Sequence, residues 1–149
     1  MDKIQDKIIQ EFDSLVNGLK GKFRYFRHFA TLGTLLPAIN RTPAKLIRAV
    51  RSKIWLEAEY RDGKVYYSGD SDSKVIKGIL LMFIRVFSGR TPKEIMNTDV
   101  YFTYEISLYD YLPEDRRSEI ASILLRMRAL AARLKFKSLD AENPDALSV

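Results

Sequence analysis

Apolar side chains recur at helical spacing in several parts of the chain. One stripe follows Asp2, a residue that can cap a helix, and consists of Ile4, Ile8, Phe12, Leu15 and Leu19. A second helical pattern covers residues 23–36 and ends at Pro37. A third begins near Pro113 and continues to Leu134. These patterns predict helices at both ends of the chain.

Alternating apolar and polar positions between these helices predict two β-strands. The first covers residues 53–58, and the second contains Val65 and Tyr67. The dipeptide Asp62-Gly63 between them is typical of a two-residue hairpin turn. We therefore expect an α+β fold in which a small antiparallel sheet of two or three strands has helices packed largely on one face.

Helix signals follow the hairpin. Either Asp70 or Ser71 can cap an apolar helix over residues 75–87. Thr91 to Glu94 has the form of a capping box with proline at the first helical position. The segment Val100–Leu108 is ambiguous, because its alternation favours a strand by period alone.

Composition indicates one globular domain. Hydrophobic residues make up 46% of the 149-residue chain and charged residues 30%, which is an ordinary balance for a folded protein. We expect a single domain over residues 1–137 and a frayed tail over residues 138–149. The longest apolar run, residues 79–84, is far too short to cross a bilayer. The N-terminus has acidic residues and lacks the continuous apolar core of a secretory signal, so we expect a cytoplasmic protein.

The chain contains no cysteine and one histidine, His28. Disulfides, thiolate ligation of metals and cysteine nucleophiles are therefore excluded. A single histidine cannot build a multi-histidine metal site. We expect no metal site and no cofactor.

The formal net charge is +6, but the lysines and arginines are dispersed along the sequence. Dispersed cations on helix faces are usually solvated surface. A nucleic-acid footprint would concentrate them on one face with aromatic side chains for stacking. Nucleic acid is therefore a minority interpretation of this charge.

A series of motifs resembles one known family. The strings WL, DGK, GDSDSKVIKGIL, SGRTPKEIMNTD and LPEDRRSEIASILLRMRALA occur in the order found in SufE, the sulfur-acceptor protein of bacterial iron–sulfur cluster assembly, and in its relative CsdE. The resemblance covers roughly residues 11–135. It implies a SufE/NifU-like fold in which residues 99–106 are helical, and we adopt that expectation over the strand.

The resemblance also implies what has happened to the family's reactive cysteine. SufE proteins take sulfane sulfur from the persulfide of a pyridoxal-phosphate cysteine desulfurase onto a cysteine in the pattern Val-x-Gly-Cys-Gln-Ser-x-Val-Trp. Ser52 and Trp55 match this pattern, whereas Ala49, Val50 and Arg51 replace its Gly-Cys-Gln. Persulfide transfer needs an attacking thiolate. Valine has none, so we expect the family's sulfur-transfer activity to be absent.

Other positions of the family pattern are retained. Together with the loop residues Val50, Arg51 and Ser52 and the strand residue Trp55, they form the candidate partner-binding or relic site: Asp70, Asp72, Lys77 and Arg116. Each also has a structural explanation, because the acidic run can cap a helix and Arg116 can pair with Glu114 or Asp115. Arg117 and Glu119 depart from the family's serine and glycine.

Three hypotheses of different kinds follow. The first is a non-catalytic SufE-like protein that binds a cysteine desulfurase or an iron–sulfur scaffold protein and modulates it. The second is an enzyme that uses Ser52 with Arg116, which lacks a nearby base in the sequence. The third is a SufE fold reused as a basic binding module for nucleic acid or an acidic protein. We favour the first hypothesis.

Overall fold

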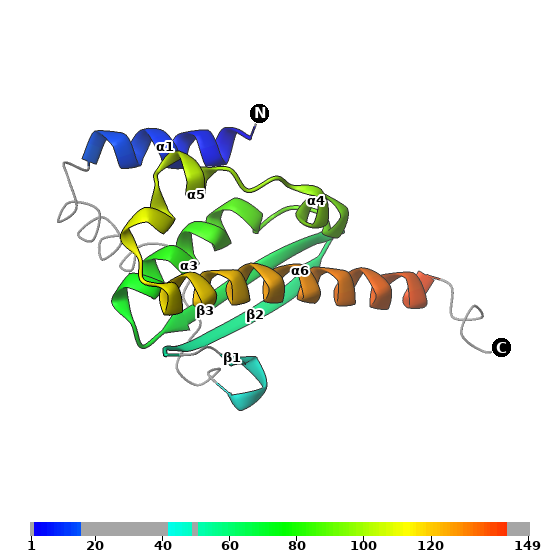
Figure 1. The fold of residues 1–149 in the computed structure, drawn as a ribbon. Helices are drawn as coiled ribbons and strands as arrows, with labels where there is room; N and C mark the ends of the chain where they lie inside the picture. The colour runs from blue at the N-terminus through cyan, green and yellow to red at the C-terminus, as the bar shows by residue number, and fades with distance from the viewer. Residues whose placement is uncertain (1, 16–41, 49–50, 143–149) are drawn as a thin grey trace.

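The computed structural model describes residues 2–15, 42–48 and 51–142 (Figure 1). Helix α1, Lys3–Leu15, begins the fold. The Asp2 carboxylate accepts hydrogen bonds from the backbone N–H groups of Ile4 and Gln5 at 3.0 and 3.1 Å. The predicted cap is thus confirmed. The helix predicted over residues 23–36 lies outside the described residues.

The sheet consists of three antiparallel strands in the order β1-β2-β3. Their bounds are Leu46–Arg48 for β1, Lys53–Arg61 for β2 and Lys64–Ser71 for β3. A short 3-10 helix, η2 (Pro43–Lys45), precedes β1. Asp62 and Gly63 have φ angles of 53° and 81°, the left-handed values that a type I′ hairpin turn requires at both positions. The predicted hairpin is confirmed.

Helix α3, Lys74–Phe87, agrees with the helix expected over residues 75–87 to within one residue, but its cap differs. Its N-cap is Ser73, whose hydroxyl accepts a hydrogen bond from the Ile76 N–H at 3.3 Å. The prediction that Asp70 or Ser71 caps this helix is therefore wrong. Both residues still belong to β3, and the Ser71 hydroxyl instead accepts from the Ser73 N–H at 3.2 Å.

Helix α4, Pro92–Asn97, has the predicted capping box. The Thr91 hydroxyl accepts from the Glu94 N–H at 3.2 Å, and the Glu94 carboxylate accepts from the Thr91 N–H at 3.3 Å. Two backbone donors at the start of the helix are satisfied in this way.

The ambiguous segment is helical. Helix α5 covers Phe102–Glu105, and the 3-10 helix η3 covers Leu108–Tyr111. The alternation that favoured a strand is misleading, because its apolar positions do not share one buried face: Phe102 and Ile106 are buried at i,i+4 spacing, whereas Tyr104 is 73% exposed. The helix implied by the family resemblance is confirmed for the residues of α5.

Helix α6, Glu114–Glu142, continues beyond the expected domain boundary at residue 137. In Figure 1, α3 and α6 lie on the same face of the sheet, and α1 packs against α3 and α5. The Tyr67 hydroxyl of β3 donates to the Met127 carbonyl of α6 at 2.7 Å, which ties the sheet to this helix. None of the described helices is long and apolar enough to cross a membrane. The predicted α+β fold is confirmed.

Candidate functional site

The segment Arg51–Ser52 contacts the first turns of α6. The Ser52 backbone N–H donates to Glu119 Oε1 at 3.1 Å, and Arg116 Nη1 donates to Ser52 Oγ at 2.6 Å. Arg51 Nη1 forms an ion pair with Asp115 Oδ2 at 2.9 Å. The structure therefore brings together three of the candidate residues named from sequence, Arg51, Ser52 and Arg116.

The residue that organises this contact is Glu119. Its side chain is fully buried, and its Oε2 lies 3.2 Å from Arg116 Nη1. The sequence offered Glu114 or Asp115 as possible partners of Arg116, whereas the ion pair in the structure is with Glu119. The i,i+3 spacing of Arg116 and Glu119 was the available signal, because side chains three residues apart meet on a helix.

The protein is stable with this buried ion pair only while Arg116 and Glu119 remain paired. Removing one partner of a buried ion pair typically destabilises a protein by about 3–5 kcal/mol, because the remaining charge is left without compensation. Glu119 also accepts the backbone N–H of Ser52. We therefore expect Glu119 to hold the Arg51–Ser52 segment on α6.

A second group of candidate residues joins the ends of β2 and β3 to α3. Asp70 is almost fully buried, and its Oδ1 lies 3.1 Å from Lys77 Nζ. Asp72 Oδ1 accepts the backbone N–H of Lys53 at 2.9 Å, and the Asp72 N–H donates to the Lys53 carbonyl at 3.2 Å. Because Lys53 follows Ser52 in the chain, this group adjoins the contact with α6.

The two remaining candidates have different outcomes. Trp55 is partly buried on β2, where its register partners are Leu46 of β1 and Asp70 of β3. It thus lies in the middle strand, in register with one of the acidic candidates. Val50, which the family resemblance suggested for the position of the cysteine, lies outside the described residues.

The hydrogen bonds of Ser52 differ from those of an activated serine nucleophile. A serine nucleophile needs a neighbouring base that accepts its hydroxyl proton. Arg116 Nη1 donates to Ser52 Oγ, and guanidinium stays protonated in proteins. Glu119 accepts from the Ser52 backbone N–H, not from the hydroxyl. These contacts position the segment.

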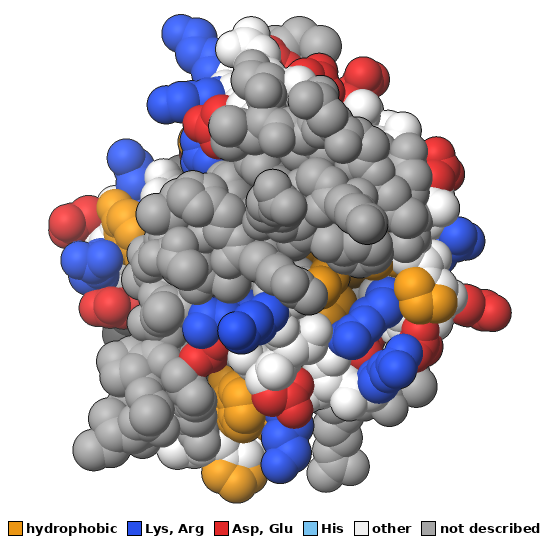
Figure 2. Space-filling model, turned by 90° about the vertical axis from the view of Figure 1, so that its left-hand side faces the viewer, with side chains coloured by type: hydrophobic (Ala, Val, Ile, Leu, Met, Phe, Trp, Pro, Cys, Tyr) orange, Lys and Arg blue, Asp and Glu red, His pale blue; other side chains and the backbone are white. Residues whose placement is uncertain are grey.

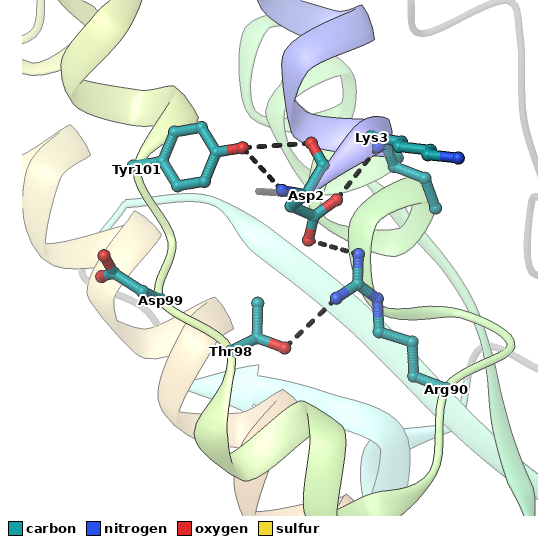
Figure 3. A pocket seen from close by; sticks show the side chains of 7 residues that line it. Asp2, Lys3, Arg90, Thr98, Asp99 and Tyr101 are labelled. Atoms are coloured by element: carbon teal, nitrogen blue, oxygen red, sulfur yellow. Dashed lines mark hydrogen bonds and ion pairs between the residues drawn. The ribbon is translucent and has the colours of Figure 1, made fainter.

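A second concave region lies between the start of α1 and the segment after α4 (Figure 3). The Arg90 guanidinium pairs with the Asp2 carboxylate and donates to Thr98 Oγ1 at 3.2 Å. The Tyr101 hydroxyl accepts from the Asp2 N–H at 3.0 Å. The sequence did not indicate these contacts, which link residues far apart in the chain and hold α1 in place.

This arrangement lowers the pKa of the Asp2 carboxyl. Burial alone would raise the pKa, but the backbone hydrogen bond from Gln5, the side-chain hydrogen bonds from Arg90 and Gln5, and the Arg90 charge together outweigh it. Asp2 is therefore held in its charged form, which is the form that caps α1.

Figure 2 shows the side of the molecule at which α6 begins in Figure 1. On the described part of this face, lysine and arginine side chains stand among acidic and hydrophobic ones. A nucleic-acid footprint would instead gather basic residues with stacking aromatics. The described part of this face does not have that arrangement.

Comparisons with known proteins identify the family. The model of the SufE family, described as an Fe-S metabolism associated domain, matches residues 6–131. A similar protein is an uncharacterized SufE-like protein of Rhizobium meliloti (strain 1021), 23% identical over 131 residues that cover 85% of this chain and 93% of the relative.

A chloroplastic quinolinate synthase of Arabidopsis thaliana is 31% identical over 91 residues, or 60% of this chain, but the match spans only 12% of that relative's length. Among solved structures, a hypothetical protein from Thermus thermophilus has a similar fold, with a TM-score of 0.70, 13% identity, and coverage of 89% of this chain and 96% of that one. The chain therefore belongs to the SufE family, which associates it with iron–sulfur metabolism.

Proposed function

We propose that this protein is a non-catalytic partner of a cysteine desulfurase in iron–sulfur cluster assembly in the cytoplasm. It binds the desulfurase or its scaffold and modulates sulfur delivery without accepting sulfur itself. The proposal combines membership of the SufE family with the absence of any cysteine from the 149-residue chain.

The single observation that carries the proposal is the residue set around the family's sulfur-acceptor loop. The family resemblance matches Val50 to the acceptor position, the chain has no cysteine, and a persulfide can form only on a thiol. The neighbouring Ser52 has its hydroxyl engaged by Arg116 and its backbone N–H engaged by Glu119. These contacts support a role in shaping a surface rather than in group transfer.

Binding and sulfur uptake are separable, so one experiment can measure both. The chain is titrated with a purified cysteine desulfurase by calorimetry, and it is then incubated with the desulfurase and cysteine and analysed by intact-mass spectrometry. We expect a saturable complex and no added sulfur. A sulfur adduct on the chain would overturn the proposal, and so would the lack of any complex.

A substitution tests whether Val50 marks the old acceptor position. Val50→Cys should acquire measurable but inefficient persulfide uptake, because Arg51 and Lys53 nearby in the sequence would favour the thiolate. The matched variant Ser52→Cys should do markedly worse, since Ser52 is only 7% exposed. If neither variant takes up sulfur although both bind the desulfurase, Val50 does not occupy the position of the family's acceptor cysteine.

A further inference from the structure

A long stretch of α6, residues 120–139, carries only positive charges. Between Ile120 and Leu139 the helix has no acidic residue, and it contains five cations: Arg126, Arg128, Arg133, Lys135 and Lys137. In Figure 1 the orange-red end of this stretch extends past the ends of the strands. Such a charge distribution favours an acidic partner.

A groove of about 450 Å³ lies between the middle of α6 and strand β1. Its lining is mostly apolar, with one cation, and consists of Leu46, Ile47, Ser122, Leu125, Arg126 and Ala129. The Leu125 side chain is 73% exposed, although leucine is usually buried. An apolar groove with a charged group in it is the usual form of a recognition site for a short segment.

Arg126 supplies the second, independent observation. Its Nε is buried and has no hydrogen-bond partner in the described structure. No ion pair joins Arg126 to any of the described acidic residues. A carboxylate placed in the groove would give the Arg126 guanidinium, which lines it, the charged acceptor that no described residue supplies.

Neighbouring residues extend this surface along the helix. Phe136 is 62% exposed and lies three turns beyond Leu125 on the same stripe, because eleven residues make about three turns. Arg133 lies two turns beyond Arg126 on the groove side, because seven residues make about two turns. The stripe therefore pairs an apolar line with a basic line, and an occupant must offer both apolar and acidic side chains.

We propose that the groove between β1 and α6 binds a segment of a partner protein in which acidic and aliphatic side chains alternate. A carboxylate of that segment accepts from Arg126, and its aliphatic neighbours cover Leu125 and Ile47. Nucleic acid fits this groove less well, because no aromatic side chain lines it for base stacking. The inference stands apart from the proposed function, since it needs neither a desulfurase nor a sulfur relay.

The test uses the chain alone and two capped peptides, Leu-Glu-Leu-Glu-Leu and its counterpart with glutamine in place of glutamate. Nuclear magnetic resonance follows the Nε–H signal of Arg126 and the methyl signals of Ile47 and Leu125 during titration. We expect the glutamate peptide to shift all three and the glutamine peptide to bind about tenfold more weakly, because a hydrogen bond to a charged acceptor is the stronger one.

A pair of variants distinguishes binding in the groove from attraction by the net positive charge of the helix. Arg126→Met should abolish the preference for the glutamate peptide, whereas Lys135→Met, which removes the same charge from the opposite side of the helix, should retain it. Lys135 lies about two and a half turns from Arg126. Equal loss in both variants would mean that only net charge matters and would overturn the proposal.

Three further results would also overturn it. They are equal affinity for the two peptides, displacement of the glutamate peptide by a single-stranded RNA oligomer or by anionic phospholipid vesicles, and shifts of the groove signals with protein concentration alone. The last of these would identify a second copy of the chain as the occupant. Failure here would leave the desulfurase-binding measurements unaffected.

Discussion

Two regions of α6, its first turns and the surface around Leu125 and Arg126, differ in how their polar groups are paired. Near its start, Asp115, Arg116 and Glu119 all bond to the Arg51–Ser52 segment or to one another. Further along, the buried Nε of Arg126 has no acceptor among the described residues, and Leu125 faces solvent. The polar groups of the first turns are thus paired within the protein. The surface around Leu125 and Arg126 instead has a buried donor without an acceptor in the described structure and an exposed apolar side chain, which favours the binding of another molecule.

The largest effect is expected from breaking the ion pair in the first turns of α6. Glu119→Ala leaves the Arg116 charge partly buried and the Ser52 N–H without its acceptor, so the free energy of unfolding should fall by about 3 kcal/mol or more. Urea denaturation measures the change. The control Glu114→Ala, at the exposed start of the same helix, should cost less than about 1 kcal/mol. Similar losses in both variants would contradict the special role of Glu119.

A smaller effect is expected from the hydroxyl in the same contact. Ser52→Ala removes the acceptor of the 2.6 Å bond from Arg116, and a hydrogen bond to a charged group contributes about 1.5–3 kcal/mol. We expect a loss in the lower part of that range, since Glu119 still pairs with the guanidinium. A double-mutant cycle with Arg116→Met should show coupling between the two residues. Additive losses would mean that the bond contributes nothing.

Outside α6, the Asp2 carboxylate is also paired, and its contribution to stability depends on pH. Its pKa is lower in the folded protein than in the unfolded chain. The resulting stability is therefore present above the ordinary aspartate pKa and is lost as the pH falls through the folded value. Asp2→Asn can still cap α1 but cannot titrate. It should be less stable than the parent chain by about 1 kcal/mol at neutral pH, and this difference should vanish in acid. A constant difference across this range of pH would contradict the assignment.

The smallest effect is expected at Arg126, beside the groove. Arg126→Met removes a buried Nε that has no acceptor in the described structure and keeps most of the apolar stem. The free energy of unfolding, measured by urea denaturation, should stay the same or rise slightly, with a change within about 0.5 kcal/mol. A loss comparable to that of Glu119→Ala would show that Arg126 is as fully satisfied as the start of the helix.

The sequence predicted those features that depend on local chemistry. The Asp62-Gly63 turn, the Thr91–Glu94 capping box and the Asp2 cap follow from backbone preferences that act within a few residues. The cap of α3 was misplaced because several polar residues in succession, Asp70 to Ser73, can each accept an N–H. Only the length of β3 decides among them.

The site was predicted only in part, because some of its contacts join residues that are far apart in the chain. Family resemblance located Arg51, Ser52 and Arg116, but it could not indicate that Glu119 lies beneath Ser52, because that contact joins residues 67 positions apart. The groove beside β1 was missed as well. Dispersed cations looked like solvated surface in the sequence, and only the fold shows that Arg126 is placed beside Leu125 and a strand.

The central claim is that this SufE-family chain engages a cysteine desulfurase without serving as its sulfur acceptor. The most direct measurement is the turnover of a desulfurase that is stimulated by a sulfur-accepting SufE protein, with this chain added in increasing amounts. We predict a dose-dependent fall in the stimulated turnover, because the two proteins compete for one docking surface, and no stimulation by this chain alone. Stimulation by this chain alone, or no effect at any dose, would contradict the account.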